Sequence, residues 1–263
     1  MRAVNLSVLA VVVVAMTVTG GTADVDTTAV SLPLNSAIKS ISPARGEVVG
    51  VAHPVVVTFN GPIANRQAAE RAIEVKSTAA MTGKFQWLDD NVVQWVPDRF
   101  WPAHSTIELS VGSRPTEFET GPAVVGVADI SEHTFTVTID GVAAGPAPHH
   151  LPHAGEAGVL LASMGRPDYP TPVDTYTVLS KDRSVIMDSS SVGIPVSDPD
   201  GYRLEVDYAV RISSRGLYVH SAPWAVQSMG FENVSHGCIS LTPATAEWYF
   251  NTVDVGDPVI VQE

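Results

Sequence analysis

Side chains that together can perform acyl transfer lie close in sequence near the end of the chain. The segment Val219–Trp224 contains His220, and the segment Asn233–Leu241 contains His236 and Cys238. Cysteine attacks as its thiolate, and a nearby imidazole can take the thiol proton or hold the thiolate as an ion pair at neutral pH. The pattern therefore indicates a thiol nucleophile, with either histidine as its base.

The glycine beside this cysteine strengthens the interpretation. Gly237 lets the backbone approach a substrate, and the amides of His236, Gly237 and Cys238 are placed to stabilise a developing oxyanion. The alternative is that the cysteine is a small buried hydrophobe and the histidines are hydrogen-bonded core residues. The concentration of these groups in two short segments favours the catalytic interpretation.

The elements around this motif are predicted to be mainly β. Thr134–Ile139 alternates polar and apolar residues before the turn signal Asp140–Gly141. A short helix is predicted after the nucleophile, because Thr242 can cap it, Pro243 suits its first turn and Ala244–Phe250 continues it. Further strands are predicted at Thr175–Leu179, Ser184–Met187, Tyr208–Ile212, Leu217–His220 and Pro258–Val261.

Residues 142–157 interrupt this pattern. They are mostly Ala, Gly, Pro and His without a strand period, which predicts an irregular, exposed loop. His149, His150 and His153 resemble a metal-ligand cluster, but the loop offers no cysteine and no fixed spacing to a fourth ligand. We expect solvated histidines and no metal.

A separate β-sandwich is predicted before the motif-bearing unit, over residues 41–126. Short β-type runs separated by Gly, Pro, Asn and Asp occur at Val55–Phe59, Ala72–Val75, Asn91–Trp95 and Thr106–Val111. Trp87, Trp95 and Trp101 fall in this region. A carbohydrate-stacking platform is one interpretation of them, but buried aromatic packing is the commoner use, so we expect core residues.

The N-terminal segment is predicted to direct export. Within residues 1–23, Arg2 precedes the mostly apolar run Leu6–Val18, whose length suits a signal peptide better than a membrane span. Small residues before Asp24 suit cleavage, and an uncleaved membrane anchor is the alternative. Residues 24–40 are rich in Thr, Ser and Ala, which predicts a flexible spacer.

Composition limits the remaining possibilities. The 263 residues favour two compact units of roughly 100–150 residues each, and 45% hydrophobic with 16% charged residues is a globular composition. The net charge of -13, with 15 scattered basic residues, argues against nucleic-acid binding. Cys238 is the only cysteine, so it cannot form an internal disulfide in an exported chain.

The motif resembles the signature of the YkuD-type L,D-transpeptidases, in which a His precedes Ser or Thr and His-Gly-Cys by about fifteen residues. Here His220 is followed by fourteen residues and then Ser235–Cys238. The resemblance runs from Ala128 to Val261 and is greatest to mycobacterial two-domain members with an N-terminal immunoglobulin-like domain. Other matching segments are Gly165–Pro167, Thr171–Pro172, Val185–Asp188, Asp200–Tyr202, His220–Trp224, Ser42–Pro43 and Val51–Phe59. The resemblance implies an immunoglobulin-like domain over 41–126 and a YkuD-type catalytic domain over 127–263.

This resemblance implies a two-step reaction on peptidoglycan in the periplasmic or cell-wall space. Cys238 would attack the third residue of a tetrapeptide stem, release D-alanine and form a thioester, and a side-chain amine of a second stem would resolve it as a 3→3 cross-link. Peptidoglycan stems would be donor and acceptor, and carbapenems would acylate the same thiol. Thiol acylation needs no cofactor.

The resemblance also implies roles for individual residues. His220 corresponds to the general base, the backbone carbonyl of Ser221 to the group that orients its ring, and His236 and Gly237 to the lining of the oxyanion site. A mobile lid would carry Met187 and Tyr202. The expected substrate-binding residues are Met187, Tyr202, Trp224, Ser235 and Ser240.

Three features depart from the family pattern. Ser240 stands where the family usually has Asn, so a hydroxyl replaces an amide. Val173–Asp174 stands where an apolar or small residue and Gly are usual, so the turn must avoid positive φ or let Asp adopt it. The 142–157 segment replaces a short hairpin and is expected to disturb an edge of the catalytic sheet.

Two other functions stay open from the sequence. An L,D-carboxypeptidase would form the same thioester and give it to water. A non-catalytic peptidoglycan-binding module would need neither a thiolate nor a base, so the presence of both Cys238 and His220 argues against it.

Overall fold

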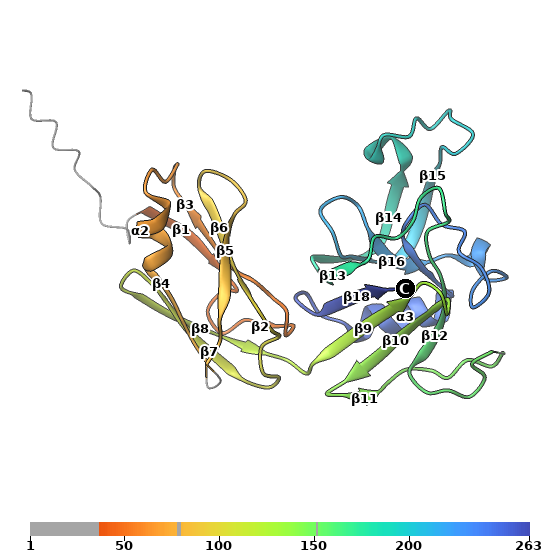
Figure 1. Ribbon diagram of the computed structural model, residues 1–263, viewed down its shortest axis with the longest axis horizontal. Helices are drawn as coiled ribbons and strands as arrows, with labels where there is room; N and C mark the ends of the chain where they lie inside the picture. The colour runs from red at the N-terminus through yellow and green to blue at the C-terminus, as the bar shows by residue number, and fades with distance from the viewer. Residues whose placement is uncertain (1–36, 78–79, 151) are drawn as a thin grey trace, which may run out of the picture. The chain divides into compact units, whose positions relative to one another are not determined.

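The computed structural model describes residues 37–77, 80–150 and 152–263, which form two β-rich units (Figure 1). This confirms the predicted fold class, mainly β with a short helix after the nucleophile. The predicted signal peptide or anchor, residues 1–23, and most of the predicted spacer lie outside the described residues. None of the helices within the described ranges is long and apolar enough to span a membrane.

The first unit is a sandwich of two four-stranded sheets, ordered β1-β3-β6-β5 and β2-β8-β7-β4 in the described residues. The strand Val55–Phe59 shows how these sheets form a core. Its residues alternate between buried and half-buried, so one face of the strand enters the space between the sheets. A short helix, α2 (Arg66–Arg71), precedes β4. The strands are β1 (Ile38–Ser42), β2 (Val48–Val49), β3 (Val55–Phe59), β4 (Ile73–Lys76), β5 (Gly83–Trp87), β6 (Val92–Pro97), β7 (Thr106–Val111) and β8 (Arg114–Thr120).

The tryptophans of this unit are core residues, as predicted. Trp95 and Trp101 are buried with ring centroids 5.4 Å apart, and the Trp101 indole donates to the carbonyl of His53. Trp87 is half-buried: its indole donates to Glu70 on α2. These rings therefore take part in packing and hydrogen bonding within the unit.

The second unit is a ten-stranded sheet in the described residues, with the order β13-β18-β9-β10-β12-β17-β16-β15-β14 and β11 paired to β10. Its long β14–β15 hairpin carries a loop, residues 189–202, that includes the 3-10 helix η1 (Ser189–Val192). The strands are β9 (Val124–Asp129), β10 (Thr134–Ile139), β11 (Val142–Ala143), β12 (Val159–Ser163), β13 (Asp174–Thr177), β14 (Ser180–Asp188), β15 (Arg203–Arg211), β16 (Tyr218–Ser221), β17 (Ile239–Leu241) and β18 (Pro258–Gln262).

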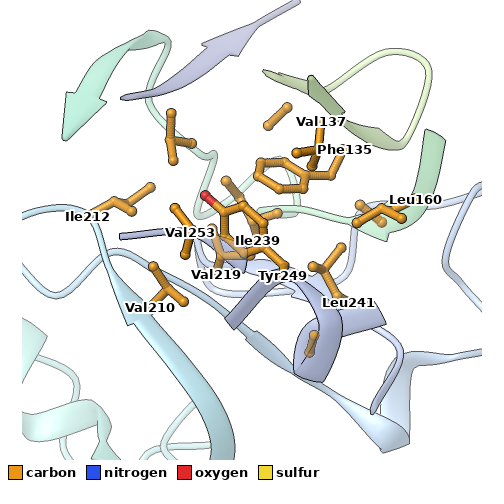
Figure 2. Close-up of a cluster of buried hydrophobic side chains, with 14 of the residues drawn as sticks. Phe135, Val137, Leu160, Val210, Ile212, Val219, Ile239, Leu241, Tyr249 and Val253 are labelled. Atoms are coloured by element: carbon orange, nitrogen blue, oxygen red, sulfur yellow. The ribbon is translucent and has the colours of Figure 1, made fainter. Parts of the chain in front are cut away.

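Helix α3 (Pro243–Thr252) closes the core of this unit. The Thr242 side chain accepts from the Thr245 amide, which is the predicted N-cap. Figure 2 shows Tyr249 from this helix against Phe135 of β10, and their rings meet edge to face with centroids 4.9 Å apart. Such a pair contributes about 0.5–1.5 kcal/mol beyond its burial.

Three predicted boundaries were wrong. The expected division between residues 126 and 127 falls inside β9, because this strand pairs with β10 and β18 of the ten-stranded sheet described above. The expected spacer, 24–40, overlaps β1, which pairs with β3 from Ile38 onward. The expected irregular segment, 142–157, begins with β11, because Asp140 and Gly141 both adopt positive φ and close a hairpin.

Elements with weak sequence signals were missed, whereas the predicted strands exist. Two of them are much longer than predicted: β14 begins four residues before Ser184, and β15 begins five residues before Tyr208. The missed elements include β5, β8, β12 and β17 as well as α2. At the Val173–Asp174 departure the turn avoids positive φ: Asp174 is the first residue of β13 and pairs with Val261.

A buried carboxyl after α3 makes stability depend on pH. Asp257 is 1% exposed, and burial raises its pKa to about 7 although the Asp254 amide donates to its Oδ2. Between about pH 4 and pH 7 the folded chain holds a proton that the unfolded chain releases, so the free energy of unfolding falls as pH rises.

We expect Asp257→Asn to remove this dependence, because the amide stays neutral. Through this carboxyl, wild type should lose about 3 kcal/mol of its free energy of unfolding between pH 5 and pH 8, and the variant should not show this loss. Urea titration at the two pH values measures the difference. Asp207→Asn, an exposed carboxyl on β15, is the matched control. Equal pH slopes for Asp257→Asn and wild type would contradict the assignment.

Candidate active site

The parallel pairing of β16 with β17 brings the motif together. His220 lies opposite Ser240 in this register, flanked by the pairs Val219 with Ile239 and Ser221 with Leu241. Side chains alternate along a strand, so the buried Val219, Ile239 and Leu241 face the core of Figure 2 while His220 and Ser240 share the other face. Cys238 precedes Ser240 by two residues and lines the same cavity as both.

The backbone fixes the tautomer of His220. The ring is 4% exposed, and its Nδ1 lies 2.8 Å from the carbonyl oxygen of Ser221. A carbonyl can only accept, so Nδ1 carries the hydrogen and Nε2 is the basic nitrogen. Burial lowers the pKa of His220 from its ordinary value, which keeps the ring neutral at neutral pH.

Cys238 is held as a neutral thiol. Burial raises its pKa to about 11, although a hydrogen bond from the Tyr218 amide partly opposes the shift. The thiol donates to the carbonyl of Gly216 at 3.8 Å. Opposite shifts in the pKa values of Cys238 and His220 favour a thiol that gives up its proton during attack over a preformed ion pair.

The turn that receives this thiol is fixed by Arg211, a residue that sequence reasoning missed. Its guanidinium donates to the carbonyl oxygens of Ser213 at 3.0 Å and Ser214 at 2.9 Å. The turn ends at Gly216, whose carbonyl faces Cys238. Nothing in the residue type or spacing of Arg211 distinguishes it from an exposed strand residue.

The backbone around Gly237 differs from the expectation of a free oxyanion donor. The Gly237 amide donates to the Ser235 hydroxyl at 3.0 Å, and that hydroxyl donates to the Cys238 carbonyl at 2.6 Å. Gly237 has φ of 119°, a backbone conformation that would be strained for a residue with a larger side chain than hydrogen. In this conformation the Gly237 amide is therefore bonded to Ser235, which stabilises the turn, and the oxyanion role expected for Gly237 stays a prediction.

Thr171 holds the same turn from a distant segment. Its hydroxyl donates to the Gly237 carbonyl at 2.7 Å and accepts from the Gly165 amide at 2.9 Å. Thr171 is 3% exposed. The sequence marked it only as part of the family resemblance, because a separation of 66 residues gives no local signal.

Two cavities meet at Cys238. The first, about 260 Å³, brings together all five predicted substrate-binding residues: Met187, Tyr202, Trp224, Ser235 and Ser240. The second, about 530 Å³, lies toward Asp174 and Arg215 and shares Tyr202, His236 and Cys238 with the first. The space beside the thiol can therefore receive peptide from two directions.

His236 differs from His220 in its hydrogen-bond partner. Its Nδ1 lies 3.4 Å from the Arg166 guanidinium, which can only donate, so this lone pair is engaged. Burial lowers the pKa of His236, and the positive charge of Arg166 lowers it further. The ring lies between Tyr169 and Tyr202, at centroid distances of 5.0 and 4.9 Å.

The loop histidines lie outside this site. His149 and His150 are exposed, as predicted, but His153 is half-buried with Nδ1 3.1 Å from Glu156. The prediction of a solvated side chain was therefore wrong for His153, because the loop folds back on itself through this contact. No cluster of three or more His, Cys, Asp or Glu side chains suited to a metal occurs in the described part of the chain.

Two family profiles match the chain. That of the bacterial Ig domain matches residues 13–114, and that of the L,D-transpeptidase catalytic domain, YkuD, matches residues 123–261. The chain belongs to the L,D-transpeptidase family. This confirms the family inferred from the motif, including its mycobacterial two-domain form.

Named relatives of this L,D-transpeptidase are similar along their whole length. "Probable L,D-transpeptidase 3" of Mycobacterium tuberculosis (strain ATCC 25618 / H37Rv) is 70% identical over 100% of both chains, and "L,D-transpeptidase 1" of the same strain is 46% identical over 99% of both. The crystal structure of M. tuberculosis L,D-transpeptidase 3 matches with a TM-score of 0.82 and 75% identity, covering 86% of this chain and 99% of that one.

Two solved structures of relatives contain β-lactam-type compounds. L,D-transpeptidase 3 from M. tuberculosis in complex with a faropenem-derived adduct matches with a TM-score of 0.82 and 75% identity, over 86% of this chain and 98% of that one. LD transpeptidase LdtMt1 in complex with imipenem matches with a TM-score of 0.79 and 48% identity, over 86% and 99%.

We expect Thr171→Val to destabilise the catalytic unit by about 2 kcal/mol, because it leaves the Gly165 amide and Gly237 carbonyl without a buried partner. Thr171→Ser keeps the hydroxyl and should cost less than half as much. Urea unfolding of the three proteins measures the difference. Equal losses for the two variants would show that the methyl group, not the hydrogen bonds, supports the turn.

Proposed function

We propose that this L,D-transpeptidase cross-links peptidoglycan through a thioester on Cys238, with His220 as the base. The observation that carries the proposal is the hydrogen bond from His220 Nδ1 to the Ser221 carbonyl, which leaves Nε2 as a free base in the cavity that holds Cys238. A neutral imidazole beside a neutral thiol suits general-base activation.

The first step is acylation. The Cys238 thiol proton passes to His220 Nε2 as sulfur attacks the carbonyl carbon of the diaminopimelyl residue at the third position of a donor stem. The C–N bond to the terminal D-alanine then breaks, and the imidazolium returns the proton to the leaving amine. A thioester remains on the enzyme.

The second step transfers the acyl group. A side-chain amine of another stem attacks the thioester carbonyl and gives a proton to His220, the C–S bond breaks, and the thiolate recovers the proton. The product is a 3→3 cross-link. No metal or organic cofactor enters either step, because the thioester conserves the energy of the acyl bond.

Substrate contacts are assigned to the first cavity. Met187, Tyr202 and Trp224 offer the apolar and aromatic surface for the stem, and Ser240 offers a hydroxyl beside His220. The complex of a relative with imipenem supports carbapenems as compounds that acylate Cys238 by opening their strained ring, and the faropenem-derived adduct of another relative extends this to a penem. Full-length similarity to named L,D-transpeptidases supports peptidoglycan stems as donor and acceptor.

We also propose that the protein works outside the cytoplasm, in the periplasmic or cell-wall space. The support is the residue pattern of segment 1–23, a signal peptide or membrane anchor. In this arrangement the spacer and the immunoglobulin-like unit hold the catalytic unit within the wall.

Intact-protein mass spectrometry tests the thioester. With a tetrapeptide-stem donor, wild type should gain the mass of the tripeptide acyl group, and addition of an amine acceptor should convert it to cross-linked dimer. Cys238→Ala should show neither event. A thioester that only hydrolyses would indicate an L,D-carboxypeptidase, and absence of any wild-type adduct would indicate a binding module.

The base assignment predicts a pH profile. The kcat/KM for acylation should rise with pH through an apparent pKa below 6.5 and level off near neutrality, because His220 accepts a proton only when neutral. His220→Gln should lower the rate by about 10²–10⁴-fold and remove this acid limb. His236→Gln is the matched control. A larger loss in His236→Gln than in His220→Gln would make His236 the base.

A further inference from the structure

An ion pair joins two segments of the candidate site that are distant in the sequence. We define the lid as residues 189–202, the loop between β14 and β15. Near its end, Asp200 accepts a hydrogen bond from the Arg166 guanidinium, and the Tyr169 hydroxyl lies 3.4 Å from the other carboxylate oxygen. Arg166 and Tyr169 belong to the loop after β12, so the lid is held from a segment outside its own hairpin.

Arg166 is itself fixed on the motif. Its amide donates to the Ser235 carbonyl at 3.0 Å, and its guanidinium carbon lies 4.7 Å from the centre of the Tyr169 ring. A second guanidinium nitrogen lies 3.4 Å from His236 Nδ1. The Arg166 side chain is 24% exposed and that of Asp200 is 48% exposed, so solvent partly screens the pair, which is joined by a charge-assisted hydrogen bond.

The lid residue affected by this pair is Tyr202. It lies two positions after Asp200, its amide donates to the Ser189 hydroxyl, and the Ser189 amide donates to its carbonyl. Its ring contacts the His236 ring and lines both cavities at Cys238. A displacement of Asp200 would therefore move a wall of the substrate site.

We propose that Arg166 and Asp200 are positioning residues that latch the lid in its substrate-competent position, with Tyr202 against His236. The inference rests on the proposed thioester function. When the latch is broken, the lid spends time in positions that do not bind donor, and apparent affinity falls with the competent fraction. Bound donor selects the closed lid again, so the rate at saturation changes little.

The test is steady-state acylation by a tetrapeptide donor in Asp200→Asn. We expect KM to rise about 5- to 30-fold while kcat changes less than about twofold, the effect of one or two kcal/mol in lid closure. Asp200→Glu, which keeps the charge, should recover at least half of the loss on a logarithmic scale. Asp207→Asn removes an exposed carboxylate from the same hairpin and should match wild type.

Hydrogen exchange supplies a readout separate from turnover. Amides of residues 189–202 should exchange faster in Asp200→Asn and in Arg166→Gln than in wild type, with equal melting temperatures showing intact folds. An unchanged KM with unchanged exchange would overturn the latch, as would a loss confined to kcat.

Failure of the latch is distinguishable from failure of the proposed function. If wild type forms the Cys238 thioester and Asp200→Asn binds donor equally well, only the latch is wrong. If wild type forms no thioester with the donor, the proposed function is wrong and the latch falls with it.

Discussion

The parallel contact between β16 and β17 is the constraint on which the site depends. Its register sets His220 opposite Ser240, and the alternation of side chains sends Val219 and Ile239 into the core at the same time. A slip of one residue would exchange these faces, exposing the apolar set and burying the polar one. The packing of α3 against the sheet through Tyr249 thus secures the chemical face as well as the core.

Burial disfavours the charged form of both reactive groups, and hydrogen bonds partly oppose it. The Ser221 carbonyl raises the pKa of His220, and the Tyr218 amide lowers that of Cys238. Arg166 has a different effect on His236, whose lone pair it engages. The site therefore contains two imidazoles with different hydrogen-bond partners, which the sequence alone does not distinguish.

The parts that the sequence predicted are those with local signals. The motif residues are near neighbours in the chain, Thr242 and Pro243 mark the start of α3, and Val55–Phe59 alternates cleanly. Most of the parts that it missed depend on distant contacts. Thr171 and Arg166 reach the site through tertiary pairing, and β9 looked like the end of the first unit because only its partners, β10 and β18, reveal its sheet. Arg211 bonds to nearby carbonyls, but its residue type does not reveal this role. The hydrogen bond from the Gly237 amide to the Ser235 hydroxyl is another contact that the residue types did not predict.

The raised pKa of Cys238 also protects the residue when no substrate is bound. With a pKa of about 11, about one thiol in ten thousand is ionised at pH 7. Oxidants and disulfides react with the thiolate, so a solitary cysteine in this environment resists sulfenic acid formation and unwanted pairing with other proteins. The burial that keeps the Cys238 thiol neutral thus also slows its reaction with oxidants.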